Sequence, residues 1–267
     1  MEMSFSQISK NRELPKFDLH VFKSRKTKYC ICIPIINEGE KIKKQLAEMK
    51  KIIPLADVII ADGGSTDNST SPKLLKRFGV RTLLIKKSPG RQATQLRMAF
   101  AYALDEGYKG IIQMDGNNKD GINAIPSFIK ALDQGYDYIQ GSRFIKGGKA
   151  INTPFRRSIG IRYFVSPVLS LASKYWYTDV TNGFRAYSRK YLLHLDVKPF
   201  RNIFVSYSLN FYLTVRANQL MLKTKEIPVT RKYPKGKIPT KMSGLGSELN
   251  LFSEVLKTAL GYYYPQD

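Results

Sequence analysis

Short apolar runs alternate with stretches of helical periodicity along most of the chain. The first apolar run is Tyr29–Pro34, and apolar residues then recur at helical spacing from Ile42 to Ile53, with lysines between them. The same alternation predicts strands at 57–61, 80–85, 111–114, 136–140 and 222–227 and helices at 72–78, 96–106, 125–132 and 206–217. This order indicates an α/β fold with a mainly parallel, Rossmann-like sheet and helices on both faces.

The two ends of the chain differ from this repeating part. Residues 1–27 are mostly polar with one short strand at 17–22, so we expect an N-terminal extension packed on a main domain at 28–240. Residues 241–267 form an amphipathic C-terminal segment, in which apolar residues recur at helical spacing from Leu249 to Leu260. We expect this segment to pack on the main domain or on a membrane.

The chain carries a large excess of positive charge. Of its 267 residues, 43% are hydrophobic and 24% are charged, which is typical of a folded protein. However, 44 Lys and Arg stand against 21 Asp and Glu, so the net charge is +23. Such an excess implies an anionic partner: nucleic acid, an anionic membrane surface or a phosphorylated substrate.

Several kinds of site are disfavoured. No glycine-rich dinucleotide loop follows the first strand and no P-loop motif occurs. Two histidines, His20 and His194, are too few for a multi-histidine metal centre. Cys30 and Cys32 share one face of the first strand without a second pair to complete a zinc site, so we expect core residues in a reducing compartment. Without a secretory signal or a run of about 20 apolar residues, we expect a cytoplasmic protein, peripheral on the inner face of the membrane.

Polar residues with binding potential follow three of the predicted strands. Asp62 and Asp115 each come directly after a strand, and Gly141-Ser142-Arg143 follows another. Ligands of parallel sheets bind beyond the carboxyl ends of the strands. A carboxylate there can accept hydrogen bonds from a nucleobase or a ribose, or it can hold a divalent cation against a diphosphate. The alternative for each aspartate is a turn former.

Five ordered blocks extend this pattern over roughly residues 28–240. They are Ile33–Glu38, Ile60–Asp67, Met114–Asn117, Gly141–Arg143 and Thr178–Tyr187. In order and spacing these blocks resemble the family 2 glycosyltransferases, and the last block resembles the signature of the polyprenyl-phosphate (dolichol-phosphate) mannosyl- and glucosyltransferase branch. The resemblance implies the A-type glycosyltransferase fold, a nucleotide-sugar donor and inversion at the anomeric carbon.

The resemblance also assigns roles to individual residues. Nucleotide-sugar binding falls to Pro34, Glu38, Asp62, Ser65, Asp115 and Lys241. We predict Asp115, Arg143 and Asp179 as catalytic residues, and we expect an acceptor phosphate to meet Arg143, Arg156 and Arg157. A departing nucleoside diphosphate needs its charge neutralised by a metal or by cations. Such a site therefore combines carboxylates, which can hold the metal, with basic side chains.

The expected cofactor is Mg²⁺ or Mn²⁺, held by Asp115 and Asn117. Asn117 stands where the family has a second carboxylate, and Lys119 stands where the lipid-phosphate branch often has another ligand. Lys119 could replace part of the metal charge or point away, and Asp120 could supply a carboxylate. A third departure is Ile36, which replaces a tyrosine that would stack on the base.

The acceptor depends on whether the site holds a base. A saccharide hydroxyl must lose its proton to a carboxylate, whereas a polyprenyl phosphate is already an anionic nucleophile. Asp179 is the one acid in a motif beyond Gly141, and Arg143, Arg156, Arg157 and Arg162 offer cations instead, although Arg156 and Arg157 could be solvated surface. We therefore predict transfer of a hexose from a UDP- or GDP-sugar to a polyprenyl phosphate. The alternative acceptor is a saccharide in surface polysaccharide or lipopolysaccharide synthesis, and a distant alternative is a basic nucleic-acid-binding protein, although no nucleic-acid module is recognisable.

Two segments favour peripheral membrane contact. Aromatic and apolar residues are interspersed with Arg and Lys in 155–177, and the C-terminal segment ends in Tyr262-Tyr263-Tyr264. Between Lys223 and Lys241 there are seven Lys or Arg and one Glu, a density that would favour anionic lipids. The alternative is that both segments pack on the sheet and the basic residues are ordinary surface.

Overall fold

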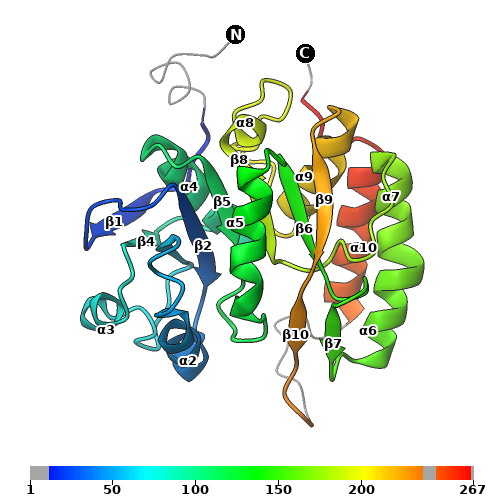
Figure 1. Cartoon of the computed structure of the whole chain (residues 1–267). Helices are drawn as coiled ribbons and strands as arrows, with labels where there is room; N and C mark the ends of the chain where they lie inside the picture. Colours follow the sequence, from blue (N-terminus) through cyan, green and yellow to red (C-terminus); the bar gives the residue numbers. More distant parts are fainter. Residues whose placement is uncertain (1–11, 237–244, 266–267) are drawn as a thin grey trace.

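A sheet of eight strands forms the centre of the protein, whose computed structural model describes residues 12–236 and 245–265 (Figure 1). The spatial order is β1-β4-β3-β2-β5-β8-β6-β9. The strands are β1 Phe17–Val21, β2 Tyr29–Ile35, β3 Asp57–Asp62, β4 Thr82–Lys86, β5 Gly110–Gln113, β6 Tyr138–Ser142, β8 Arg185–Ser188 and β9 Thr224–Pro228. Strands β4, β3, β2 and β5 are parallel, β8 is antiparallel to both β5 and β6, and β9 is parallel to β6. The predicted mainly parallel sheet is confirmed.

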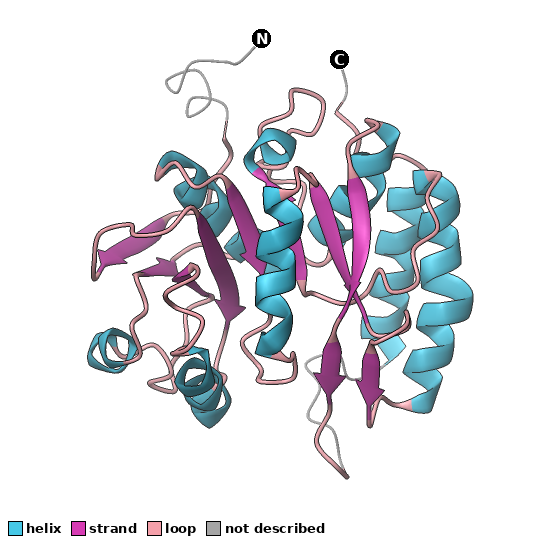
Figure 2. Ribbon diagram, in the orientation of Figure 1, coloured by secondary structure: helices cyan, strands magenta, loops and turns pink. Residues whose placement is uncertain are grey.

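Helices cover both faces of this sheet (Figure 2). One face carries α2 Gly39–Met49, α3 Pro72–Arg77, the short turn η1 Ile122–Ala124 and α5 Ile125–Asp133. The other carries α4 Gln92–Asp105, α8 Arg189–Leu192, α9 Ser208–Gln219 and, farther out, α7 Ser166–Ser173 and α10 Leu245–Ala259. Strand β2 shows the alternation that separates the two cores, because Cys30 and Cys32 face one and Ile31 and Ile33 face the other. The cysteines are free and buried on one face, as predicted.

Strands β1 and β8 of the main sheet differ in whether the sequence predicted them. The short strand predicted at 17–22 is β1, which pairs antiparallel with β4 and so adds an edge strand to the sheet. Strand β8 was not predicted as a strand. It lies between β5 and β6, and its Arg185 is buried and donates to the main-chain oxygens of Val180, Asn182 and Asn210. Arg185, which belongs to the sequence block Thr178–Tyr187, therefore holds the loop before β8 in place.

A second, two-stranded sheet lies beyond the carboxyl ends of β6 and β9. It pairs β7 Lys149–Ile151 with β10 Thr230–Lys232 in parallel, and both strands extend below the main sheet in Figure 1. Strand β10 also holds the loop after β5, since Lys232 N–H donates to the Lys119 oxygen and Gly121 N–H donates to the Thr230 oxygen, each at 2.8 Å. This contact brings β10 to the edge where ligands of parallel sheets bind.

The helical layer continues through α6 Phe155–Gly160 and η2 Ile161–Val165 into α7, and α10 packs against α7 and α9. Val255 buries its side chain there, whereas Leu249, Phe252, Leu256 and Leu260 stay exposed. Helix α10 thus packs on α7 and α9 and keeps an apolar stripe exposed. Across the described residues, every helix is too short or too polar to cross a bilayer.

Candidate active site

The turns that follow β2 and β3 are joined by hydrogen bonds. Asp62, at the end of β3, is buried, and its carboxylate accepts from the Ser65 N–H and from Ser65 Oγ at 2.5 Å. Ser65 Oγ in turn accepts from the Asn37 N–H at 2.9 Å. Asn37 has a φ of +49°, in the left-handed region that asparagine tolerates. The structure therefore brings Asp62 and Ser65 together and gives Asp62 the partners of a turn former.

The remaining residues assigned to the nucleotide sugar lie in three places. Pro34 is buried in β2 opposite Ala61 of β3, next to the Asp62 turn. Glu38 lies just before α2, and one of its carboxylate oxygens is 3.4 Å from the Lys41 ammonium. Lys241 lies outside the described residues.

Asp115 comes just after β5, and both of its carboxylate oxygens have partners. Oδ2 accepts from Arg231 Nη2 at 2.9 Å, and Oδ1 accepts from Gln92 Nε2 at 3.3 Å. The buried Gln45 of α2 donates to the Asp115 main-chain oxygen and accepts from the Asn118 N–H, so it holds the loop at both ends. Sequence reasoning missed Gln45 as well as Arg231.

Arg231 lies in β10 and is only 8% exposed. We attributed the basic stretch 223–241 to lipid attraction, and for Arg231 that interpretation is wrong, because its guanidinium is directed into the site. Val229, Arg231 and Tyr233 are buried whereas Thr230 and Lys232 between them are more exposed. This period-two alternation is the sequence signal that could have identified Arg231 as an inward-facing residue.

Arg231 also bridges Asp115 to a second acid. Its Nη1 donates to Asp120 Oδ2 at 2.6 Å, and the Asp120 side chain is fully buried. Burial raises the pKa of Asp120, while the nearby guanidinium opposes that shift. Burial alone lowers the pKa of Arg231, but Asp120 and Asp115 outweigh it and raise the pKa well above the ordinary value, so the guanidinium stays charged.

The residues expected to hold a divalent cation do not fit one in this arrangement. Asn117 presents its amide Nδ2 to Asp115 Oδ2 at 3.5 Å, and its oxygen accepts from the Lys119 N–H at 3.3 Å. Mg²⁺ and Mn²⁺ need oxygen ligands, whereas both carboxylate oxygens of Asp115 and the amide oxygen of Asn117 already accept hydrogen bonds. Among the described residues no group of three or more His, Cys, Asp or Glu side chains could hold a metal ion.

Lys119 lies beside this cluster. Its ammonium nitrogen is 4.8 Å from the centre of the Tyr233 ring, and the Arg231 guanidinium carbon is 5.7 Å from the same centre. Burial and the neighbouring Arg231 lower the pKa of Lys119. Tyr233 therefore lies beside two cations, a geometry in which the ring face attracts positive charge.

Arg143 and Asp179 form a buried ion pair. Arg143 Nε donates to Asp179 Oδ2 at 2.6 Å and Nη2 donates to Oδ1 at 2.7 Å. Burial lowers the pKa of Arg143, but the hydrogen bond and charge of Asp179 reverse this shift and raise it. The structure brings these two predicted residues together as partners, and their roles toward a substrate stay predictions.

The two arginines of α6 differ in position. Arg157 is half-buried, and its Nη1 donates to the Tyr233 hydroxyl at 3.4 Å, so it joins the group around Arg231. Arg156 is exposed. Arg162 lies farther along, with its guanidinium carbon 5.3 Å from the centre of the Phe144 ring.

Glu226 of β9 anchors the segment that carries Asp179. Its two carboxylate oxygens accept from the N–H and the hydroxyl of Thr178, at 2.9 to 3.1 Å. Burial raises the pKa of Glu226 to about 7, and the bonds from Thr178 oppose that shift. Sequence reasoning missed this residue, although it is the one acid in the basic stretch 223–241.

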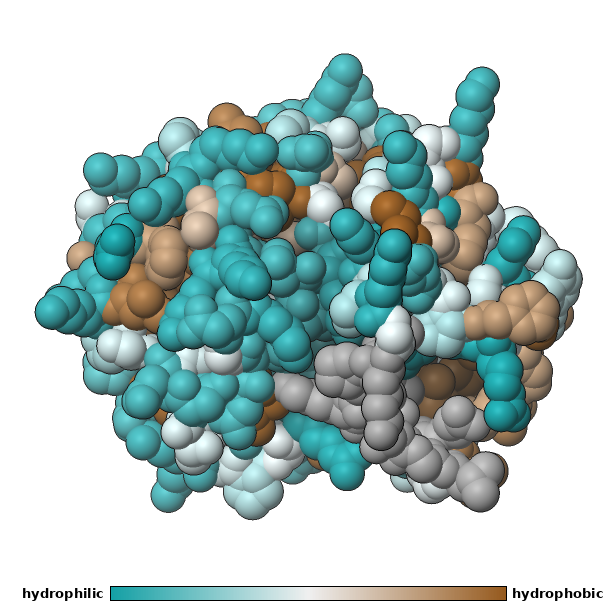
Figure 3. Space-filling view, turned by 90° about the horizontal axis from the view of Figure 1, so that it is seen from below, coloured by the Kyte–Doolittle hydropathy of each residue, from teal (hydrophilic) through white to brown (hydrophobic). Residues whose placement is uncertain are grey.

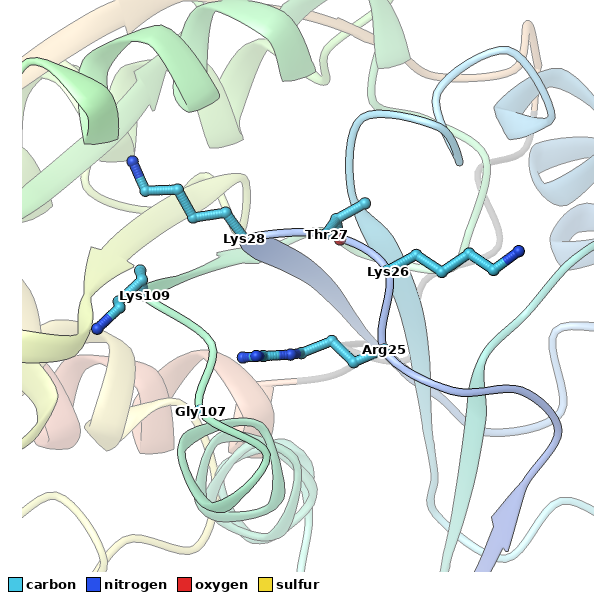
Figure 4. Close-up of a pocket in the computed structure, with 6 residues that line it drawn as sticks. All are labelled: Arg25, Lys26, Thr27, Lys28, Gly107 and Lys109. Atoms are coloured by element: carbon cyan, nitrogen blue, oxygen red, sulfur yellow. The ribbon is translucent and has the colours of Figure 1, made fainter.

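The side chains described so far gather at the carboxyl edge of the sheet, the face shown in Figure 3. Hydrophilic residues surround a hollow near the middle of that face. A separate hollow of about 470 Å³ lies at the opposite, amino edge, lined by Arg25, Lys26, Thr27, Lys28, Gly107 and Lys109. Its Lys26, Lys28 and Lys109 side chains point away from one another (Figure 4), so that hollow has no convergent polar groups.

Comparison with known proteins identifies one family and several relatives. Residues 30–195, more than half of the chain, match the family described as glycosyl transferase family 2. The chain is 26% identical over 202 residues to the undecaprenyl-phosphate mannosyltransferase of Micrococcus luteus, covering 74% of this chain and 81% of that one. It is 26% identical over 208 residues to the polyprenol monophosphomannose synthase of Mycolicibacterium smegmatis, covering 75% and 76%.

Solved structures confirm the A-type glycosyltransferase fold. The glucosyl-3-phosphoglycerate synthase of Mycobacterium tuberculosis with UDP superposes with a TM-score of 0.61 at 14% identity, covering 86% of this chain and 79% of that one. The same enzyme with Mn²⁺, UDP and phosphoglyceric acid also has a TM-score of 0.61, at 15% identity, with coverages of 90% and 85%.

Proposed function

The chain belongs to glycosyl transferase family 2 and is a glycosyltransferase that uses a nucleotide sugar, and from this premise we propose that it transfers a hexose to a polyprenyl phosphate. In the proposed reaction a phosphate oxygen of the lipid attacks the anomeric carbon from the face opposite the leaving group. The bond from that carbon to the diphosphate breaks, a nucleoside diphosphate departs, and the configuration is inverted. Relatives named as polyprenyl-phosphate mannosyltransferases support this acceptor class.

One observation carries the choice of acceptor: three acids at the carboxyl edge, Asp115, Asp120 and Asp179, are paired with arginines. Asp115 and Asp120 both accept from Arg231, and Asp179 accepts from Arg143. A carboxylate in such a pair would give up its charge interaction with the arginine if it took a proton from a sugar hydroxyl. A lipid phosphate needs no base, so this arrangement favours it over the alternative saccharide acceptor.

Arg231, Asp115, Asp120 and Tyr233 form a group that we call the Arg231 cluster. Basic side chains near this cluster provide a binding site for the acceptor phosphate. We assign the main contact to Arg157, which reaches the cluster through Tyr233, with Arg143 and Arg156 as the further predicted contacts. Planar guanidinium groups bind phosphate oxygens in pairs, which gives both charge neutralisation and orientation.

The donor in this proposal is a UDP- or GDP-hexose bound across the ends of β2, β3 and β5. Pro34, Glu38, Asp62 and Ser65 lie on the side of the nucleoside, and Asp115 lies toward the diphosphate. The divalent cation expected from the resemblance also has support from the Mn²⁺ bound by the mycobacterial enzyme. Because the side chains here do not fit that ion, we assign it no step.

A lipid acceptor also requires contact with a bilayer, and we propose a cytoplasmic protein that docks peripherally on the inner face of the membrane. The segment 155–177, which runs from α6 through α7 and the turn after it, exposes Phe155 (78%), Tyr163 (73%), Leu171 (76%) and Trp176 (65%). The apolar stripe of α10 adjoins it, since the Phe164 and Phe252 rings lie 4.9 Å apart. Apolar residues are visible toward this side in Figure 3. Exposed aromatic and aliphatic groups amid basic residues are typical of interfacial segments.

The test is transfer from a panel of radiolabelled UDP- and GDP-hexoses to a short-chain polyprenyl phosphate, followed by organic extraction. We expect labelled lipid with one donor and no labelled product with oligosaccharide acceptors. Arg157→Ala should raise the KM for the lipid phosphate with little change in the KM for the donor, whereas Lys130→Ala, which removes an exposed lysine of α5, should alter neither.

Other outcomes separate the alternatives. Labelled saccharide without labelled lipid would replace the lipid acceptor by a saccharide acceptor. Binding of arbitrary DNA in a salt-sensitive manner, with no donor turnover, would instead support the nucleic-acid-binding alternative.

A further inference from the structure

The Arg231 guanidinium is hydrogen-bonded to the carboxylate oxygens that would otherwise hold a divalent cation. It lies 2.9 Å from Asp115 Oδ2 and 2.6 Å from Asp120 Oδ2. A cation at that place would have to displace a buried positive charge from two charge-assisted hydrogen bonds. Asn117 presents amide hydrogens to the same Asp115 oxygen, so it too opposes a cation there.

The main chain fixes Arg231 in this position. Hydrogen bonds on both sides of Asp120, from Lys232 N–H to the Lys119 oxygen and from Gly121 N–H to the Thr230 oxygen, tie β10 to the loop after β5. The guanidinium is therefore held against the loop by the backbone and is not a flexible surface group. A preorganised cation costs little reorganisation when charge develops on a ligand.

The charges of the residues from Asp115 to Lys119 also favour a site without a metal ion. Relative to a motif with carboxylates at 115 and 117, the amide of Asn117 removes one negative charge and Lys119 adds one positive charge. The combined change equals the charge of a divalent ion. Arg231 carries five N–H donors on its guanidinium, and the bonds to Asp115 and Asp120 use one each on Nη2 and Nη1.

We propose that Arg231, together with Lys119, neutralises the donor diphosphate in place of a divalent cation, so that this chain binds a nucleoside diphosphate without metal. The inference rests on the proposed function, because it concerns the donor of that reaction. A guanidinium can bind two phosphate oxygens at once, and the Lys119 ammonium adds a second point charge. Their partner is the diphosphate group, whichever nucleoside carries it.

Calorimetric binding of UDP and GDP, in EDTA and in Mn²⁺, tests the proposal without relying on turnover. For the unaltered protein we expect one nucleotide to bind with dissociation constants that differ by less than about threefold between the two conditions. Loss of a charged hydrogen-bond partner lowers affinity by about 10- to 100-fold, so Arg231→Met should bind that much more weakly in EDTA. Mn²⁺ should partly restore binding to Arg231→Met, because no guanidinium then occupies Asp115 Oδ2 and Asp120 Oδ2.

Two further variants complete the test. Lys232→Ala removes an exposed charge one residue away and should bind like the unaltered protein, while Arg231→Lys, which keeps the charge without the two-pronged geometry, should bind more tightly in EDTA than Arg231→Met. Binding of the unaltered protein only with Mn²⁺ would overturn the inference and leave the proposed function standing, even if Arg231→Met did not fold. Unchanged binding by Arg231→Met in EDTA would also overturn it. Absence of nucleotide binding in both conditions would refute the proposed function itself.

Discussion

Arg143 and Asp179 form a two-pronged ion pair from which water is excluded: the Nε–Oδ2 and Nη2–Oδ1 distances are 2.6 and 2.7 Å, and the side chains are 2% and 0% exposed. The Arg143 N–H also donates to Asp179 Oδ2 at 3.1 Å. The pair therefore joins the end of β6 to the loop before β8 by three bonds. A carboxylate engaged in this way is first a structural partner.

Removing one member of this pair should destabilise the protein strongly. Asp179→Asn leaves the Arg143 charge buried without a counter-ion, and breaking such a pair costs about 3–5 kcal/mol of unfolding free energy. The double variant Arg143→Met, Asp179→Asn should lose less than Asp179→Asn alone, because no uncompensated charge remains. Denaturant unfolding measures both. As a control, Asp18→Asn breaks the exposed Lys87–Asp18 pair and should cost less than about 1 kcal/mol.

The same variant tests the acceptor. If the acceptor is a lipid phosphate, folded Asp179→Asn should still form labelled lipid, since no proton has to be removed. Complete loss of transfer by protein whose circular dichroism and donor binding are unchanged would instead identify Asp179 as a base. That outcome would contradict the proposed acceptor class.

Gly183→Ala should impair the reaction more than the fold. A Cβ at this position would lie 2.8 Å from Asp115 Oδ1 and 3.2 Å from its carboxyl carbon, so the carboxylate must move. A displacement of about 1 Å in a catalytic group can lower the rate by about 100-fold. Steady-state transfer assays with a thermal melt measure the two effects separately.

Gly160 offers the matched control for Gly183. A Cβ there meets nothing within 4 Å, and the residue has a helical φ of −57°. Because alanine is favoured over glycine in helices by about 0.5–1 kcal/mol, Gly160→Ala should raise the melting temperature slightly and leave transfer unchanged. Equal activity of the two alanine variants would show that Asp115 does not need its present position.

Glu226 should make stability depend on pH in the neutral range. Burial raises its folded-state pKa to about 7, above the ordinary value of 4.5, so the folded protein holds a proton that the unfolded chain releases. Its contribution is therefore fully present below pH 4.5 and is lost as the pH rises through about 7. The loss is about 3 kcal/mol by linkage.

Glu226→Gln removes that titration. Subtracting the unfolding free energy of the variant from that of the unaltered protein at each pH isolates the effect of the one group. We expect the difference to decrease with rising pH between about 4.5 and 7 and then to level off. A constant difference across this range would mean that Glu226 titrates normally.

The exposed apolar side chains of the segment 155–177 should bind anionic vesicles. Each large apolar side chain buried contributes about 1.5–3 kcal/mol, so Phe155→Ser with Trp176→Ser should weaken vesicle binding by well over tenfold. Co-sedimentation measures this, and added salt should weaken binding further. Met221→Ser removes an even more exposed apolar residue just after the end of α9 and should have little effect. Equal binding by all three proteins would place the membrane contact elsewhere.

Local pattern by itself determined the order of strands and helices from β2 to β6, because the burial of β2 and the amphipathic face of α2 are properties of neighbouring residues. It also determined that Asp62 and Asp115 follow strands, and that parallel strands would bring both to one edge. The five ordered motif blocks indicated the family to which the chain belongs. These inferences needed no contact between distant residues.

Tertiary structure alone decided which partners these acids have. Arg231 reaches Asp115 across 116 positions in the chain, and Glu226 reaches Thr178 across 48. Strand β8 enters the sheet antiparallel to β5 and β6, and its Arg185 binds main-chain oxygens from two separate segments. Pairing of buried charges depends on distance and desolvation in three dimensions, and neither quantity is encoded in local residue spacing.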